Sequence, residues 1–224
     1  MPRANISDSI QLGRLSADCS FMLTHLVRQN DDKTDEQAKE ILTRILDLRG
    51  LPPTPLLIAS ESGWYSTAWA SNIFNPITNN FDGESNSKAV CFTESTLSGL
   101  KAHRDVFKAK YGLAFSRQYL FTKNANPCLN IKQDILKKKL VRNGEIYDRY
   151  IYNFIPSELH PFINIIHDRF DATHEREWRV PNNLNFELKD ILFLFCPESD
   201  FELFSQIQNK AKPVLFDLNW LDGI

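Results

Sequence analysis

The sequence is poor in cysteine, and its cysteines are scattered. Cys19, Cys91, Cys128 and Cys196 lie far apart, and no CxxC pair or Cys/His cluster occurs. This spacing supplies neither the ligand pattern of a zinc site nor a disulfide framework. We therefore expect reduced, mostly buried thiols, as in a cytoplasmic protein, and no bound metal.

Long apolar runs are missing as well. No stretch approaches the ~20 apolar residues that a membrane-spanning helix requires. Residues 1–5 lack the apolar core of a signal peptide. The chain is therefore predicted to be soluble and cytoplasmic, without a membrane partner.

Several motifs of nucleotide binding and catalysis are absent. The sequence contains no Walker loop and no GxGxxG loop, which argues against nucleoside triphosphate folds and Rossmann-type dinucleotide folds. It contains no GxSxG elbow, and no histidine stands at motif spacing from a nucleophilic Cys or Ser. A catalytic triad therefore has no support.

The composition is that of an ordinary globular protein. The chain has 224 residues, of which 42% are hydrophobic and 24% charged, with a formal net charge of -2. Such a charge lacks the general basic field of a dedicated nucleic-acid binder, although a local basic patch can still occur. Because no internal repeat or linker is visible, residues 1–224 are predicted to form a single α+β domain.

Hydrophobic patterning predicts a mixture of strands and helices. Thr34 and Gln37 have the spacing of a capping box at the start of a helix, and Gly50 marks its end. The basic run at residues 137–139 is interpreted as the solvated face of a long helix. The polar and aromatic loop at residues 58–88 is interpreted as a functional surface or as cover for the core. Strands are expected at residues 21–26, 89–94, 112–117, 127–131, 177–180, 190–196 and 213–218, and helices at residues 34–50, 95–107, 133–170 and 201–207.

The clearest candidate site is the pair Glu175 and Glu177, at the start of the strand predicted at residues 177–180. In an extended chain, residues i and i+2 point to the same side. Two carboxylates so placed raise the pKa of at least one of them, unless a cation or a substrate hydroxyl lies between them. The alternative is an exposed polar strand end whose glutamates pair with Arg176, Arg179 or a lysine.

Four segments in this order resemble the AbiGi-type abortive-infection family of bacterial anti-phage proteins. A Thr24-His25 step ends the early strand, Val90-Cys91-Phe92-Thr93-Glu94-Ser95 leads into a helix, and Tyr111-Gly112-Leu113-Ala114-Phe115-Ser116 follows. Glu175-Arg176-Glu177-Trp178-Arg179 is the fourth segment, and an ANPV-like stretch lies at Ala125-Asn126-Pro127-Cys128. The match covers residues 20–180. It implies a role in phage defence, as a toxin held in check by a cognate antitoxin or as the antitoxin component itself.

The order of these parts is more distantly similar to ADP-ribosyltransferases of the DarT kind. That resemblance implies an ADP-ribosyltransferase-like split β-sheet with flanking helices, which binds NAD and transfers ADP-ribose to nucleic acid or protein. Glu177 would be the catalytic carboxylate, which stabilises an oxocarbenium-like state as the N-glycosidic bond of NAD breaks. Glu175 would orient or deprotonate the acceptor. No metal would be needed.

The same resemblance assigns residues that would bind NAD. Thr24 and His25 would hold the nicotinamide ribose and carboxamide, and Phe92, Thr93 and Ser95 would line the floor of the site. Arg117 and Arg176 would lie near the pyrophosphate.

Two readings compete with the transferase. The chain could be a non-enzymatic binding module in which Glu175 and Glu177 belong to an interface. It could also be a nuclease whose paired carboxylates hold a divalent metal, although no aspartate-lysine arrangement accompanies them.

Overall fold

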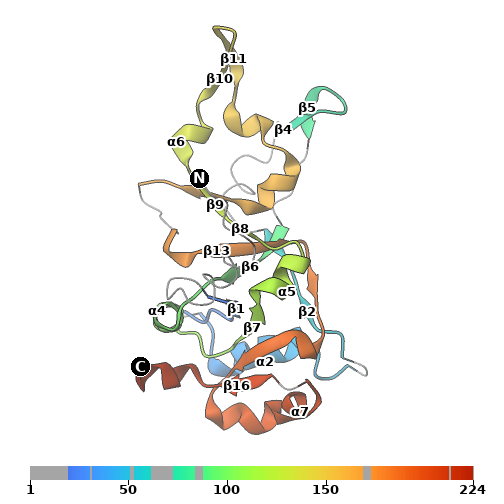
Figure 1. Cartoon of the computed structure of the whole chain (residues 1–224), viewed down its shortest axis with the longest axis vertical. Helices are drawn as coiled ribbons and strands as arrows, with labels where there is room; N and C mark the ends of the chain where they lie inside the picture. Colours follow the sequence, from blue (N-terminus) through green and yellow to red (C-terminus); the bar gives the residue numbers. More distant parts are fainter. Residues whose placement is uncertain are drawn as a thin grey trace, which may run out of the picture. The chain divides into compact units, whose positions relative to one another are not determined.

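The computed structural model describes residues 20–30, 32–50, 53–61, 73–83, 88–168, 173–211 and 213–223. They form a mixed α/β structure with a mixed sheet and several helices (Figure 1), which confirms the coarse fold prediction. The chain divides into two compact units. Unit 1 comprises Met1–Leu57, Phe92–Lys123 and Leu184–Ile224, and unit 2 comprises Ile58–Cys91 and Asn124–Asn183. That all 224 residues form a single domain stays a prediction.

Unit 1 is built on a four-stranded arrangement in the order β16-β15-β7-β1. Neighbouring strands are antiparallel, except that β15 and β16 run parallel. At its other edge β1 meets β6, where Thr24 stands opposite Thr93. The strands are β1 (Met22–Leu26), β6 (Lys88–Thr93), β7 (Gly112–Ser116), β15 (Ile191–Phe195) and β16 (Val214–Phe216), with a separate antiparallel pair of β2 (Leu56–Leu57) and β14 (Leu184–Asn185).

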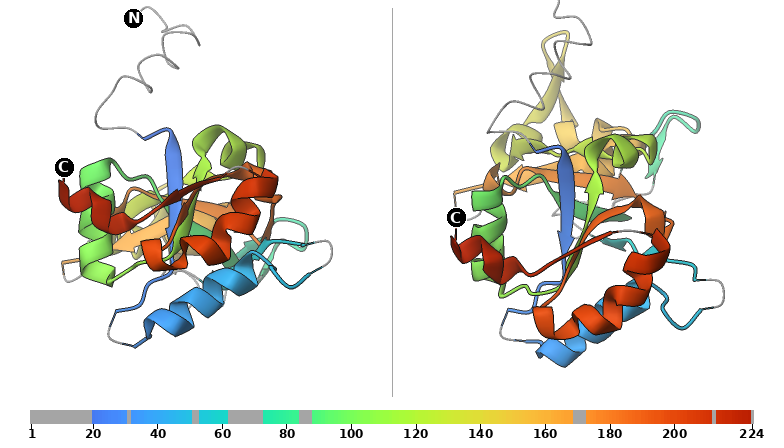
Figure 2. Two further views of the ribbon diagram at one scale, coloured as in Figure 1. Left: turned by 90° about the horizontal axis from the view of Figure 1, so that it is seen from below. Right: turned by 60° about the horizontal axis from the view of Figure 1, so that its bottom comes forward.

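The helices of unit 1 begin where the sequence predicts them. Thr34 and Gln37 form the predicted capping box, with Gln37 N donating to Thr34 Oγ1 at 3.3 Å and Thr34 N donating to Gln37 Oε1 at 2.9 Å. Thr96 caps the second helix. The helices are α2 (Asp35–Ile45), α4 (Leu97–Phe107), α5 (Arg117–Thr122) and α7 (Phe201–Ala211), and short 3-10 turns lie at η4 (Leu188–Asp190), η5 (Glu198–Asp200) and η6 (Leu218–Gly223). Figure 2 shows α2 and α7 side by side.

The core of unit 1 requires a glycine where two strands approach closely. Gly112 lies opposite Leu26 in the pair β1 and β7. A Cβ at this position would stand 2.6 Å from the carbonyl oxygen of His25 and 2.8 Å from Cδ2 of Leu26. Only glycine fits this contact. The buried residues packed in this region are Met22, Leu100, Ala114, Phe195, Leu218 and Leu221.

Unit 2 contains shorter strands in several small sheets. β6 reaches into this unit and continues the order β6-β13-β8, and β3 also pairs with β6. The other pairs are β9 with β12, which are parallel, and the antiparallel hairpins β4-β5 and β10-β11. The bounds are β3 (Ser60–Glu61), β4 (Ile73–Asn75), β5 (Asn80–Gly83), β8 (Asn126–Pro127), β9 (Leu129–Lys132), β10 (Lys139–Arg142), β11 (Glu145–Tyr150), β12 (Ile163–Ile166) and β13 (Glu177–Pro181).

The long helix predicted at residues 133–170 is wrong. Only α6 (Gln133–Leu136) is helical, and the β10-β11 hairpin, the 3-10 turns η1 (Ile151–Phe154) and η2 (Ser157–Phe162), and β12 follow it. The hairpin turns at Asn143-Gly144, where both φ angles are positive, at 54° and 82°. These values match a type I′ turn, which Asn-Gly favours over helix. The basic run at residues 137–139 therefore leads from α6 into a strand.

The remaining strand and helix predictions agree with the structure to within a few residues. The segment predicted at residues 127–131 forms two short strands, β8 and β9. Of the aromatic loop, residues 62–72 and 84–87 lie outside the described residues, as does Cys19. Its role as a functional surface stays a prediction.

Candidate functional site

Thr24 and Thr93 lie side by side in unit 1, on β1 and β6. The Thr24 side chain is buried, with 2% of the residue exposed. Its Oγ1 donates to the backbone carbonyl of Thr93 at 3.2 Å. The hydrogen bond satisfies a hydroxyl that would otherwise be costly to bury.

His25 and Phe92 continue this contact along the two strands. Their ring centroids are 5.7 Å apart, and Phe92 also packs edge-on against Phe115 at 6.0 Å. Phe92 is 1% exposed, whereas His25 is half-buried. Phe92 is therefore part of the packed interior of unit 1, with the imidazole of His25 beside it, and its role in a nicotinamide site stays a prediction.

Glu94 and Ser95 follow β6 and lead into α4. Oε1 of Glu94 accepts from the backbone N–H of Ser20 at 3.1 Å and from Nη1 of Arg117 at 3.4 Å. Arg117, at the start of α5, thus has an acidic neighbour. The Oγ of Ser95 is buried and has no hydrogen-bond partner within the described part of the chain.

Glu94 is a residue of this cluster that the site prediction missed. It is 8% exposed, and burying a carboxylate to this degree is costly unless a cation or N–H donors replace its hydration. Its place directly after Thr93 was the signal available in the sequence, because the predicted site already included residues on either side of it.

In unit 2, Glu177 is held by Arg179. Nε of Arg179 donates to Oε1 of Glu177 at 2.9 Å, and Nη2 donates to Oε2 at 2.9 Å. The side chain of Glu177 is 11% exposed and that of Arg179 is 2% exposed. Two parallel N–H···O bonds of this kind form the strongest geometry available to an arginine and a carboxylate.

Arg179 has further partners on η2 and β12. Its Nη1 donates to the carbonyl oxygens of Pro161 at 3.0 Å and Ile163 at 3.1 Å, and its Nη2 lies 3.4 Å from Oδ1 of Asn164. Burial alone would lower the pKa of Arg179, but the hydrogen bonds and charge of Glu177 raise it above its ordinary value. The guanidinium is therefore charged at every accessible pH.

Arg179 is the second residue that the site prediction missed. It was expected only in the alternative in which the glutamates of a polar strand end pair with nearby cations. Glu177 and Arg179 are residues i and i+2 of β13, so the strand places both side chains on one face. The same spacing rule that suggested pairing Glu175 with Glu177 applies here instead.

The expectation that Glu175 and Glu177 project together from an extended strand is wrong. Glu175 ends the 3-10 turn η3 (Thr173–Glu175), and Arg176 has a positive φ of 44°. The strand begins at Glu177, so the period of two does not reach back to Glu175. Arg176 is exposed. Catalytic roles for the two glutamates stay predictions.

The predicted residues are thus divided between the two units. Thr24, His25, Phe92, Thr93, Ser95 and Arg117 belong to unit 1, and Glu175 and Glu177 belong to unit 2. Within unit 1, the predicted residues lie on β1, at the end of β6 and at the first residues after β6 and β7. No protein family, curated protein or solved structure matches the chain.

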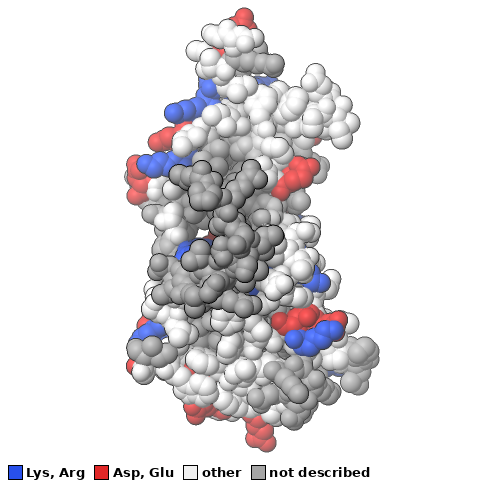
Figure 3. All heavy atoms as spheres, in the orientation of Figure 1, with Lys and Arg blue, Asp and Glu red and all other residues white. Residues whose placement is uncertain are grey.

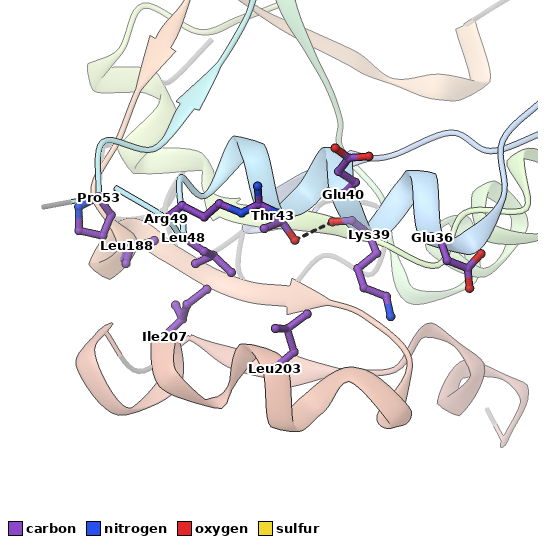
Figure 4. A pocket seen from close by; sticks show the side chains of 10 residues that line it. All are labelled: Glu36, Lys39, Glu40, Thr43, Leu48, Arg49, Pro53, Leu188, Leu203 and Ile207. Atoms are coloured by element: carbon purple, nitrogen blue, oxygen red, sulfur yellow. Dashed lines mark hydrogen bonds between the residues drawn. The ribbon is translucent and has the colours of Figure 1, made fainter. Parts of the chain in front are cut away.

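A cavity of about 480 Å³ opens elsewhere in unit 1, between α2 and α7 (Figure 4). Leu48, Leu203 and Ile207 give it an apolar wall. Around them stand charged side chains, among them Glu36, Lys39, Glu40 and Arg49. None of the predicted site residues lines this cavity. Its volume is in the range of small-molecule sites, but its charges of both signs favour no particular ligand.

Among the described residues, no group of three or more His, Cys, Asp or Glu side chains could hold a metal ion. Over the same residues, no helix has the length and apolar character needed to cross a membrane.

Proposed function

We propose that this chain is an NAD-dependent ADP-ribosyltransferase of bacterial anti-phage defence, a toxin-type effector that modifies nucleic acid or protein. The observation that carries the proposal is the cluster in unit 1. There Thr24 and His25 of β1 contact Thr93 and Phe92 of β6, and these are four of the residues to which the resemblance to DarT-type transferases assigns NAD binding. The single pairing of β1 with β6 at Thr24 is compatible with an ADP-ribosyltransferase-like split sheet.

The proposed reaction breaks one bond and forms another at the same carbon. The glycosidic bond between nicotinamide and the ribose C1 breaks, and nicotinamide leaves with the bonding electron pair. A nucleophile on the acceptor forms the new bond to C1 and loses its proton. The protein contributes by orienting the ribose and by stabilising the positive charge that develops on it.

Ser95 gives the proposal its strongest local argument. A buried hydroxyl without a partner costs ~1–3 kcal/mol of stability. Such a group is retained more readily when a ligand completes its hydrogen bonds. A ribose hydroxyl or a carboxamide of NAD would do so, and Thr24 and Phe92 belong to the same unit.

Glu177 keeps capacity for a substrate although Arg179 holds it. Each carboxylate oxygen has two acceptor sites, and Arg179 occupies one on each oxygen. Asn164 Nδ2 also donates to Oε2 at 3.4 Å, so among the described residues the remaining acceptor site is the second one of Oε1. The fork fixes the orientation of the carboxylate, and a carboxylate held in this way can stabilise a developing positive charge. In this proposal Glu177 is the catalytic carboxylate and Arg179 is a positioning residue.

A Ser95→Ala substitution tests the NAD site without disturbing the fold. Because the hydroxyl has no partner within the described residues, the free energy of unfolding should be unchanged or slightly higher. The KM for NAD should rise severalfold. The matched control is Ser116→Ala, because Ser116 caps α5 through Tyr119 N at 3.0 Å, so its loss should lower stability instead. An unchanged KM for NAD in Ser95→Ala would contradict the assignment of Ser95 to the NAD site.

A Glu177→Gln substitution tests the chemistry. Nicotinamide release from NAD, measured by chromatography with radiolabelled NAD and a cell lysate, should fall at least ~100-fold, as is common when a charge-stabilising group is removed. Tyr111→Phe, a buried change in unit 1, is the control for lost stability. Turnover retained in Glu177→Gln, or lost equally in Tyr111→Phe, would contradict the assignment.

The Glu177–Arg179 fork also favours a second candidate, a non-enzymatic binding module such as an antitoxin. A carboxylate already paired at both oxygens fits a purely structural role. The two candidates differ in one measurement. The binding module releases no nicotinamide at any protein concentration, whereas the transferase releases it in proportion to the enzyme added.

A further inference from the structure

The β10-β11 hairpin is a two-stranded arm of unit 2. Its strands pair with each other and form a sheet of their own. Figure 1 draws the hairpin at the end of unit 2, beyond α6. The type I′ turn at Asn143-Gly144 gives the arm a tight, twisted tip.

The segment that carries the arm is basic in an acidic chain. Residues 132–150 contain six Lys and Arg and three Asp and Glu, a net charge of +3, whereas the whole chain has -2. The rest of the chain therefore carries -5. Figure 3 shows Lys and Arg atoms over α6 and the adjoining part of β10, with acidic atoms beside them. Lys132, Lys137, Lys138, Lys139 and Arg149 are all exposed.

Near the tip, the arm exposes an apolar pair. Val141 and Ile146 stand directly opposite each other across the two strands, and they are 61% and 72% exposed. A cross-strand aliphatic pair normally faces a core, because water contact is unfavourable for both side chains. Here the pair sits beside the basic run 137–139, on the same arm.

The base of the arm, at the end of β11, is held by ring contacts and a hydrogen bond. The guanidinium of Arg149 lies 4.5 Å from the centroid of the Phe81 ring, and the rings of Tyr150 and Tyr152 stack at 5.4 Å. Tyr150 N also donates to Oδ1 of Asn153 at 2.8 Å. These contacts fix the base of the hairpin, so that its tip is presented in a defined direction.

We propose that the β10-β11 arm binds double-stranded DNA. The major groove of B-DNA admits a two-stranded β-ribbon, and the lysines at the root would contact the phosphates beside the groove. The apolar pair at the tip would contact base edges or wedge between them, as aliphatic side chains of DNA-bending proteins do. A protein partner would fit the apolar pair but gives no reason for the clustered positive charge.

Binding of DNA by the arm does not require the transferase activity. If the proposed function holds, the arm would bring nucleic acid to the enzyme as its acceptor, and this part of the inference rests on that function. The acceptor would then be nucleic acid rather than protein.

The first test measures binding of the full-length protein to a fluorescent 25-base-pair duplex of arbitrary sequence, and to a fluorescent single-stranded RNA of one strand's sequence, by anisotropy from 50 to 300 mM salt. The variant Lys137→Gln/Lys138→Gln/Lys139→Gln should bind at least tenfold more weakly at 50 mM salt. The slope of log K against log salt should decrease by up to ~3, because each phosphate contact contributes ~0.9. The control Lys33→Gln/Lys123→Gln/Lys189→Gln removes the same charge from exposed positions of unit 1 and should bind within twofold of the wild type.

Three results of this test would overturn the proposal. They are the absence of duplex binding by the wild type at 50 mM salt, equal losses in the two triple variants, and tighter binding of single-stranded RNA than of the duplex. The first would leave a protein partner as the occupant of the arm. The second would show that binding follows net charge rather than this surface.

The second test addresses the apolar pair. Val141→Ser/Ile146→Ser should weaken duplex binding severalfold while leaving the salt slope unchanged, because no phosphate contact is lost. Glu177→Gln separates this inference from the proposed function, since it should abolish NAD turnover and leave duplex binding intact. Duplex binding without any NAD turnover in the wild type would support the arm and refute the transferase. NAD turnover without duplex binding would support the transferase and refute DNA binding by the arm.

Discussion

Arg179 joins Glu177 in a two-point ion pair that is almost completely buried in unit 2. The same guanidinium donates to two backbone carbonyls, so one arginine fastens β13 to the segment 161–164. Removing either member of a buried pair leaves the other charge without compensation, at a cost of ~3–5 kcal/mol. Any loss of activity in a Glu177 variant must therefore be separated from a loss of stability.

A double-mutant cycle measures this coupling. Glu177→Leu and Arg179→Met should each lower the free energy of unfolding by ~3 kcal/mol or more. The combined variant should cost clearly less than their sum, because it leaves no isolated charge in the interior. Urea titrations of the four proteins provide the measurement. Strictly additive losses would show that the fork contributes no coupling of its own.

Asp200 links Tyr111 and Lys39 in unit 1 through bonds of unequal burial. Tyr111 Oη donates to Oδ2 of Asp200 at 2.6 Å in the interior, whereas Lys39 reaches Oδ1 at 2.7 Å with 32% of its side chain exposed. Tyr111→Phe should therefore cost ~1.5–3 kcal/mol, and Lys39→Met less than ~1 kcal/mol. Thermal unfolding of both variants checks the ranking. A larger loss in Lys39→Met would reverse this interpretation.

His160 should make stability depend on pH below neutrality. The residue is fully buried, which lowers its pKa below 6.5, and the hydrogen bond to Ile155 O and the charge of Glu158 only partly offset this. Below pH 6.5 the unfolded chain binds a proton that the folded histidine does not. Stability is therefore complete above pH 6.5 and falls with decreasing pH through the folded-state pKa, by at most ~1.4 kcal/mol per pH unit. His160→Gln should flatten the difference between pH 7.5 and pH 5 in urea titrations; an unchanged pH profile would contradict the prediction.

The sequence predicts unit 1 better than unit 2, for physical reasons. Buried apolar strands such as β7 and β15 and the capping box at Thr34 carry local signals that their tertiary environment reinforces. The strands that carry Thr24 and Phe92 are predicted as well, whereas the Thr24–Thr93 and His25–Phe92 contacts depend on the pairing of β1 with β6, which no local pattern reveals. In unit 2, the apolar side chains of the segment 133–170 occur at spacings compatible with a helix, although Asn143-Gly144 within it is a hairpin turn signal.

The site in unit 2 could not be predicted in full because its partners are distant in sequence. The pairing of Arg179 with Glu177, two residues earlier, is predictable from the strand period alone, because residues i and i+2 of a strand share a face. Its bonds to Pro161 and Ile163 depend on the path of the chain after the hairpin, which no local pattern reveals. The positive φ of Arg176, which separates Glu175 from the strand, has no sequence signal either.

Two glycines should respond to substitution by alanine for different reasons. In Gly112→Ala the new Cβ would collide with backbone atoms of β1, so we expect a loss of ~1–3 kcal/mol in global stability. In Gly144→Ala nothing lies within 4 Å of the Cβ, and the cost of ~1 kcal/mol comes from the φ of 82°. That cost should appear as faster hydrogen exchange at the Arg142 and Glu145 amides, which form the hydrogen-bonded pair next to the turn, with the melting temperature almost unchanged. A D-alanine at residue 144, introduced by chemical ligation, should restore protection because its preferred φ is positive. If D- and L-alanine destabilise the hairpin equally, the turn is not type I′.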